Sequence, residues 1–307
     1  MKLLHLHPDF KPFSDKYAEA GHVELIDYPS GCEPHVRVHL KEHQNESILI
    51  TARIHNSDDF IRTALAADAL MGLSIQSRIE VFIPYMPHAR QDRRAVPGDA
   101  FSSQVLLSML GGMNHNFIHV FDVHNPDAYP PRVDVRSHSS VPFTNMVLHA
   151  EDRVNVRREV MLVVPDKGAM KRLYVNMDLP DTELRAEARY TTSMLQLPML
   201  VVDKQRDPVN GKLQITVPQR DVLNRTCIIL DDICDGGGTF IPIAKELKLR
   251  GAARVVLAVS HGLFTKGVQL LFEGGIDHIY TTNSFQDLAS GDRLTQFTDW
   301  SQLTPNL

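Results

Sequence analysis

The sequence predicts an α/β protein of two similar domains, each with a mainly parallel sheet flanked by helices. Apolar strand-like runs alternate with helical patterns along the chain, which is typical of parallel sheets covered on both faces. The run of such units before about residue 145 looks like the run after it. A length of 307 residues suffices for two domains that each bury a core.

Short runs of β-forming residues predict the strands. They are Ser47–Thr51, Ile79–Pro84, Phe117–Phe121, Val160–Pro165, Met199–Val202, Thr226–Leu230, Arg254–Ser260 and His278–Thr281. The expected helices between them are Asp58–Gly72, Phe101–Leu110, Thr239–Arg250 and Lys266–Glu273. Ser57 is the expected N-cap of the first helix.

The polar stretch His149–Glu159 is the expected junction between the domains. The predicted domains are therefore residues 1–148 and 149–307, with room for the last residues to pack back on the first domain. No short repeat and no low-complexity tract interrupts this organisation.

The composition suits a soluble, cytoplasmic enzyme, with 43% hydrophobic and 22% charged residues. A net charge of −5 predicts no nucleic-acid or membrane partner, so a phosphate ligand must be held locally. The chain has no apolar run of about 18 residues, and its start lacks the apolar region of a signal peptide. Cys32, Cys227 and Cys234 lack metal-type spacing and are interpreted as reduced thiols.

The most informative stretch is Ile228–Thr239, where β-forming residues lead into the paired acids Asp231 and Asp232. The loop that follows consists of Asp235, Gly236, Gly237, Gly238 and Thr239. Glycines let backbone N–H groups close around a phosphate, and the helix that follows adds its N–H groups and positive dipole end. An ordinary glycine-rich turn is the alternative. The paired acids favour a sugar 5-phosphate, with both acids facing the ribose hydroxyls, and the stretch resembles the phosphoribosyl-diphosphate loop of the type I phosphoribosyltransferase fold.

The second informative segment, Pro84–Ser102, follows a strand and so emerges at the ligand end of a sheet. Its arginines and Gln91 can grip a polyphosphate, stack on a base and read its edge. A solvated basic loop is the alternative. The string Ala-Arg90-Gln-Asp-Arg-Arg94, followed by Gly-Asp-Ala-Phe-Ser, resembles the Tyr-Ala-Arg-Gln-Asp-Arg-Lys segment of ribose-phosphate pyrophosphokinases.

Other segments are similar to the same family, in the same order along the chain. Asp122–Pro126 looks like the family's Asp-Leu-His-Ala-Pro, and Tyr28–Glu33 looks like its Phe-Ser-Asp-Gly-Glu. Val164–Arg172 lies where the family has its pyrophosphate loop, and Val201–Arg206 looks like the Ile-Asp-Lys-Arg-Arg that opens its catalytic lid. The resemblance spans the chain from about Tyr28 to about Thr282.

This resemblance implies an activity and a set of ligands. The expected reaction transfers the diphosphate of Mg-ATP to the anomeric hydroxyl of ribose 5-phosphate, giving phosphoribosyl diphosphate and AMP. Mg²⁺ is the implied cofactor. The resemblance also implies a homo-oligomer, commonly a hexamer, with ATP sites shared between subunits.

The resemblance also assigns roles to residues. Lys204 and Arg206 are the implied catalytic residues, and His124 and Asp166 are the implied metal ligands. Glu33, Arg90, Gln91 and His124 are the implied ATP-binding residues. Ribose 5-phosphate is expected to bind Asp231, Asp232 and the loop Asp235–Thr239.

Two alternatives stay open, one of them because of departures from the family pattern. The pyrophosphate loop has Lys167 and Ala169 where a small residue and a glycine are usual, so that loop can differ in shape. A catalytically silent regulatory homologue is therefore one alternative, although such a chain would be expected to lose Lys204 or His124. A type I phosphoribosyltransferase is the other, although it would not need the arginine-rich segment.

Overall fold

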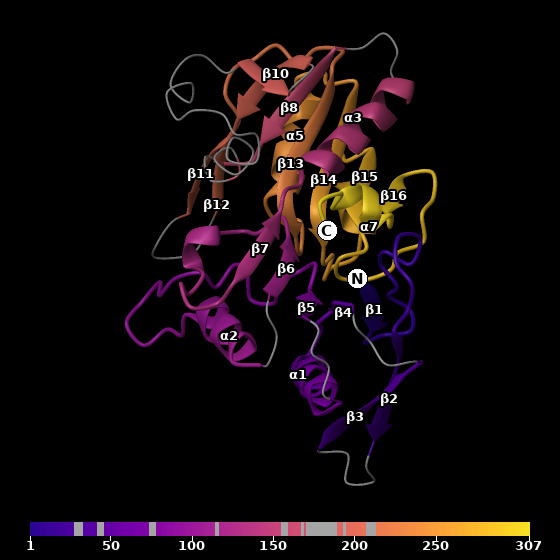
Figure 1. The fold of residues 1–307 in the computed structure, drawn as a ribbon. Helices are drawn as coiled ribbons and strands as arrows, with labels where there is room; N and C mark the ends of the chain where they lie inside the picture. Colours follow the sequence, from indigo (N-terminus) through magenta and orange to yellow (C-terminus); the bar gives the residue numbers. More distant parts are fainter. Residues whose placement is uncertain are drawn as a thin grey trace. The chain divides into compact units, whose positions relative to one another are not determined.

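A computed structural model describes residues 1–27, 33–41, 46–73, 78–113, 117–154, 159–166, 169, 189–192, 195–206 and 213–307 (Figure 1). The chain forms two compact units. Unit 1 comprises Met1–Ser139 and Thr298–Leu307, and unit 2 comprises Ser140–Phe297. Both are built on mainly parallel sheets, which confirms the predicted fold class. The division into domains 1–148 and 149–307 stays a prediction.

Unit 1 contains a five-stranded parallel sheet in the order β1-β4-β5-β6-β7. Its strands are β1 (Lys2–His5), β4 (Ile48–Thr51), β5 (Ile79–Phe82), β6 (Phe117–Phe121) and β7 (Val135–His138). The sequence predicted β4, β5 and β6 to within two residues at each end. An antiparallel hairpin, β2 (Gly21–Asp27) with β3 (Pro34–Leu40), forms a separate two-stranded sheet. Val36 and Val38 of this hairpin belong to the main core of the unit.

Helices α1 (Ser57–Gly72) and α2 (Ser102–Gly111) contribute Phe60, Leu70 and Leu107 to that core. The predicted N-cap Ser57 was wrong. The N-cap is Asn56, whose side chain accepts the Asp59 N–H at 3.0 Å, and Ser57 is the first residue of α1. A short 3₁₀ helix, η1 (Pro126–Ala128), follows β6.

The opposite face of this sheet is covered by the end of the chain. Helix α7 (Trp300–Leu303) places Trp300 edge-on to Phe10, Phe82 and Phe121, with ring centroids 6.4, 5.2 and 5.4 Å apart. Trp300 is 1% exposed, so burial of its ring and the T-shaped contacts hold the C-terminal segment against the sheet.

Unit 2 contains a seven-stranded sheet in the order β16-β15-β14-β13-β8-β10-β9, parallel except for the β9–β10 pair. Its strands are β8 (Val160–Val164), β9 (Arg189–Thr192), β10 (Leu195–Val201), β13 (Thr226–Cys234), β14 (Arg254–Gly262), β15 (His278–Thr282) and β16 (Leu294–Phe297). A separate hairpin pairs β11 (Asp203–Arg206) with β12 (Leu213–Thr216).

Helix α5 (Phe240–Leu249) and the short helix α6 (Gln269–Glu273) cover one face of this sheet, where Ile243, Leu247 and Leu271 meet its buried side chains. Helix α3 (Val141–Val154) packs against β14 from the other face. Residues 149–154 of the predicted junction His149–Glu159 are helical and form the last part of α3. None of the helices in the described ranges is long and apolar enough to cross a membrane.

Candidate ligand sites at the carboxyl edges of the two sheets

The order of the strands in unit 2 brings most of the predicted ribose 5-phosphate and metal residues to one edge of its sheet. β8 lies between β13 and β10, and all three run in the same direction. Asp166 follows the carboxyl end of β8, and β11 with Lys204 and Arg206 follows that of β10. The side chains of Lys204 and Arg206 lie outside the described residues. Such an edge is where α/β sheets bind ligands.

The paired acids lie within β13 rather than after it. The sequence predicted that this strand ends at Leu230, but its ladder with β14 continues to Cys234 opposite Gly262. Successive side chains of a strand point to opposite faces, so Asp231 and Asp232 differ in surroundings. Asp232 is buried, whereas Asp231 is half-buried and its Oδ1 accepts the Asp232 N–H at 3.0 Å.

The glycine-rich loop turns β13 into α5. Gly237 is buried at φ +78°, and a Cβ there would lie 2.6 Å from Cδ2 of Leu271. The Gly237 carbonyl accepts the Phe240 and Ile241 N–H groups at 3.0 Å, which starts the helix. The loop therefore stands at the N-terminus of a ten-residue helix, where backbone N–H groups and the helix dipole favour an anion.

Two buried side chains at the same edge were missed by sequence reasoning. His261, near the end of β14, has Nδ1 2.8 Å from Oγ of Ser284, which follows β15. The Ser284 hydroxyl in turn donates to the Ser260 carbonyl at 3.2 Å. Their signal was present, because a histidine directly after the predicted strand Arg254–Ser260 falls at the ligand edge of a parallel sheet.

The pyrophosphate-loop region is described only in part. The Asp166 carboxylate accepts the Ala169 N–H at 2.9 Å, and Ala169 is buried in a helical conformation that a residue with a Cβ adopts without strain. Lys167 lies outside the described residues, as do Gly168 and Met170–Arg172.

In unit 1, the arginine-rich loop and His124 lie at the carboxyl ends of the adjacent strands β5 and β6. Arg90 and Gln91 are exposed, and the Gln91 carbonyl accepts the hydroxyl of Ser103 in α2 at 3.1 Å. Asn125, next to His124, donates its amide to Asp92 at 2.7 Å and ties the two loops together.

The structure does not bring every predicted site residue to these edges. Glu33 is exposed at the start of β3, in the separate hairpin, while Tyr28–Cys32 lie outside the described residues. Within the described ranges, no three His, Cys, Asp or Glu side chains gather into a metal-binding group. The predicted metal ligands belong to different units, His124 to unit 1 and Asp166 to unit 2.

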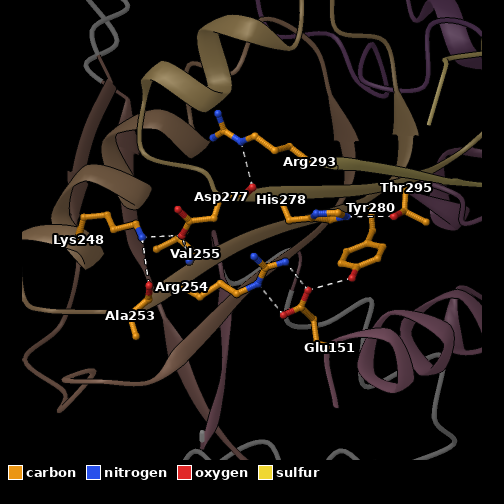
Figure 2. Close-up of polar contacts among 10 residues, drawn as sticks. All are labelled: Glu151, Lys248, Ala253, Arg254, Val255, Asp277, His278, Tyr280, Arg293 and Thr295. Atoms are coloured by element: carbon orange, nitrogen blue, oxygen red, sulfur yellow. Dashed lines mark hydrogen bonds and ion pairs between the residues drawn. The ribbon is translucent and has the colours of Figure 1, made fainter. Parts of the chain in front are cut away.

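A second polar network lies at the opposite, amino-terminal edge of the unit 2 sheet (Figure 2). Glu151 of α3 is fully buried and accepts hydrogen bonds at 2.9 Å from Nε and Nη2 of Arg254 and from the Tyr280 hydroxyl. The hydrogen bonds to Glu151 raise the pKa of Arg254, and burial raises the pKa of Tyr280. Arg254 and Tyr280 lie on β14 and β15, so the network joins α3 to the sheet away from the candidate site.

Next to it, Asp277 accepts Lys248 Nζ at 2.5 Å and the Val255 N–H at 2.7 Å. Figure 2 shows both pairs beside Arg293, whose guanidinium donates to the Asp277 carbonyl at 3.2 Å. These contacts connect the end of α5 with the starts of β14 and β15, and we interpret the whole group as structural.

The fold and the candidate site define an α/β protein with a glycine-rich loop in front of α5. The chain matches the family model of the phosphoribosyl synthetase-associated domain over residues 170–292. It is 27% identical over 270 residues to a ribose-phosphate pyrophosphokinase of Pyrococcus furiosus, covering 87% of each chain. It is 28% identical over 236 residues to that of Mycoplasma pneumoniae, covering 74% of this chain and 65% of the relative.

The solved structures agree with this relationship. A phosphoribosylpyrophosphate synthetase from Mycobacterium smegmatis superposes with a TM-score of 0.71 at 20% identity, covering 96% of this chain and 93% of that one. At that identity the superposition establishes the fold, while the sequence relatives establish the kinship. The predicted family is confirmed: the chain is a homologue of the ribose-phosphate pyrophosphokinases.

Proposed function

We propose that this protein is a ribose-phosphate pyrophosphokinase, which transfers the diphosphate of ATP to the anomeric hydroxyl of ribose 5-phosphate. One observation carries the proposal: Asp231 and Asp232 lie in a strand that leads directly into the loop Asp235–Thr239 and the N-terminus of α5. In a homologue of these enzymes, that arrangement suits a ribose bearing a 5-phosphate.

The proposed ribose 5-phosphate site lies in unit 2. The 5-phosphate is held by the backbone of the glycine-rich loop, and the acids of β13 accept hydrogen bonds from the ribose hydroxyls. Lys204 and Arg206 on the β11–β12 hairpin supply positive charge to the transferring diphosphate. Their contribution comes from positioning and charge neutralisation, on which phosphoryl transfer mainly depends.

The proposed ATP residues lie mainly in unit 1. Arg90 and Gln91 hold the base and phosphates, and His124 lies on the adjacent strand end. Glu33 belongs to the part of the site that a neighbouring subunit shares in a homo-oligomer. The same relationship supports a cytoplasmic protein.

Magnesium suits the carboxylate among the two side chains that the sequence singled out. Mg²⁺ prefers oxygen ligands and keeps much of its water, so one or two carboxylates together with substrate phosphates are enough to hold it. Asp166 supplies such a carboxylate at the carboxyl edge of the unit 2 sheet, and His124 is the candidate in unit 1. When bound, the ion neutralises charge on the phosphate oxygens.

The test is the reaction itself. The purified protein with ATP, ribose 5-phosphate and Mg²⁺ should form AMP one-for-one with ribose 5-phosphate consumed. ADP as the sole nucleotide product would instead indicate an ordinary γ-phosphoryl kinase. If the protein shows no turnover but alters the activity of an added synthetase, it is instead a catalytically silent regulatory homologue. The unusual pyrophosphate loop is the reason for that alternative.

Lys204→Ala is the matched variant in this assay. It should lower kcat by at least about a hundredfold, because a charge acting mainly in the transition state is lost. ATP binding without ribose 5-phosphate should change little. Removal of a transition-state contact costs much more than a factor of two in kcat. If the variant keeps more than about half of the wild-type kcat, the catalytic charge therefore lies on another residue.

A further inference from the structure

The loop between β14 and α6 contacts the end of β13 and the start of the glycine-rich loop. The N–H groups of Leu263 and Phe264 donate to the Cys234 carbonyl at 2.9 and 3.1 Å. The Thr265 hydroxyl then donates to Oδ1 of Asp235, the first residue of the glycine-rich loop. These bonds fix the position of one loop against the other.

Lys266 is the next residue along this loop, and its side chain lies over Gly236. A Cβ on Gly236 would stand 3.2 Å from Cδ, 3.3 Å from Cε and 3.4 Å from Cγ of Lys266. The lysine methylenes therefore lie in close contact with Gly236, and a Cβ there would displace them by a few tenths of an ångström. A C–N single bond is about 1.5 Å, so the ammonium group lies within about 5 Å of that point.

The charge of Lys266 is available to a ligand. The residue is exposed, and none of the described residues forms an ion pair or hydrogen bond with its ammonium group. By contrast, Lys248 on the same side of the sheet is bound to Asp277 at 2.5 Å. A compact ammonium on a flexible stem suits a phosphate as a point charge, as lysines do in other phosphate-binding loops.

We propose that Lys266 is a further ligand of the 5-phosphate, adding one positive charge to the backbone N–H groups of the glycine-rich loop. The ligand it selects is a dianionic phosphate monoester rather than the unphosphorylated sugar. This assignment rests on the proposed function, because it takes the loop to be the ribose 5-phosphate site. Lys266 acts in binding and has no part in the transfer step.

The experiment compares three variants of the full chain. Lys266→Met keeps the unbranched stem over Gly236 and removes the charge, whereas Lys266→Arg keeps the charge. Lys245→Met, at an exposed lysine of α5, is the matched control. The readouts are KM for ribose 5-phosphate, KM for ATP, kcat, and calorimetric binding of ribose 5-phosphate without ATP at low and high salt.

Lys266→Met should raise KM and Kd for ribose 5-phosphate at least about tenfold, the lower end for a charge-assisted contact. KM for ATP should stay unchanged, and kcat should stay within about twofold because the contact exists in both ground and transition states. Lys266→Arg and Lys245→Met should resemble the wild type. The difference between wild type and Lys266→Met should shrink as salt rises.

The outcomes separate this inference from the proposed function. If the wild type binds and converts ribose 5-phosphate but Lys266→Met does so equally well, the assignment of Lys266 is refuted and the proposed function stands. If Lys266→Met and Lys266→Arg lose affinity equally at all salt concentrations, the stem alone matters and the assignment is also refuted. If the wild type neither binds nor converts ribose 5-phosphate, the proposed function fails and the assignment of Lys266 falls with it.

Discussion

Replacing Gly237 by alanine tests whether the turn from β13 into α5 requires a residue without a Cβ. Gly237 has φ +78°, where an L-residue with a Cβ pays about 1–2 kcal/mol. The new Cβ would also lie 2.6 Å from Cδ2 of Leu271 and 3.3 Å from Cδ1 of Ile241. Leu271 is 2% exposed, so it moves only by disturbing its neighbours, and overpacking of this kind costs about 1–3 kcal/mol.

Together these effects predict a loss of about 3 kcal/mol in the free energy of unfolding. For a unit of this size that loss corresponds to a fall of about 6–12 °C in Tm. The measurement is urea and thermal unfolding followed by circular dichroism, with ribose 5-phosphate absent so that ligand binding does not contribute.

Gly238→Ala is the matched control in the same loop. Nothing lies within 4 Å of the Cβ it would add, and its φ lies outside the left-handed region. We expect its free energy of unfolding to stay within about 1 kcal/mol of the wild type, because the smaller entropy of the unfolded chain offsets any local cost. Equal stability of the two variants, to within about 0.5 kcal/mol, would refute the argument from φ and the Leu271 contact.

Two further predictions concern buried charge and pH. Glu151→Gln should lower the free energy of unfolding by about 3 kcal/mol, because it leaves the Arg254 guanidinium without its carboxylate. The control Glu246→Gln, at a 40%-exposed carboxylate paired with Arg250, should cost less than about 1 kcal/mol. Equal effects of the two variants in denaturant titrations would contradict this prediction. Burial, with smaller effects from His119 and Arg136, lowers the pKa of His138 from 6.5 to about 4, so the unfolded chain binds more protons between these values and stability should rise with pH from about 4 to 6.5. His138→Gln should flatten that part of the profile of unfolding free energy against pH. The remainder of the slope comes from His5, His7 and His278, whose pKa values burial also lowers. A steeper rise in the variant would show that the sign is wrong.

The amino-acid sequence by itself determined the elements whose causes are local. Strand-like runs of five or six residues predicted β4, β5, β6 and β8, because a strand buried on both faces has few polar positions. The loop Asp235–Thr239 was also readable, since glycine is the residue that accepts the positive φ found at Gly237. The family resemblance depended on such short segments in a fixed order, and the comparisons confirm it.

Elements whose stability comes from distant partners were not readable in the same way. β13 runs on through Asp231 and Asp232 because its ladder with β14 continues to Cys234, although two adjacent acids are poor strand formers. The polar residues 149–154 are helical because Glu151 is bound by Arg254 and Tyr280, 103 and 129 residues away in the chain.

The composition of the candidate phosphate site was likewise decided by tertiary structure. Lys266 and Thr265 follow β14, more than twenty-five residues beyond the glycine-rich loop, and reach it because β13 and β14 are neighbours in register to their last residues. Local propensity acts over a few residues, whereas this contact depends on which strands pair. Only the folded chain therefore shows that a lysine stem lies in close contact with Gly236.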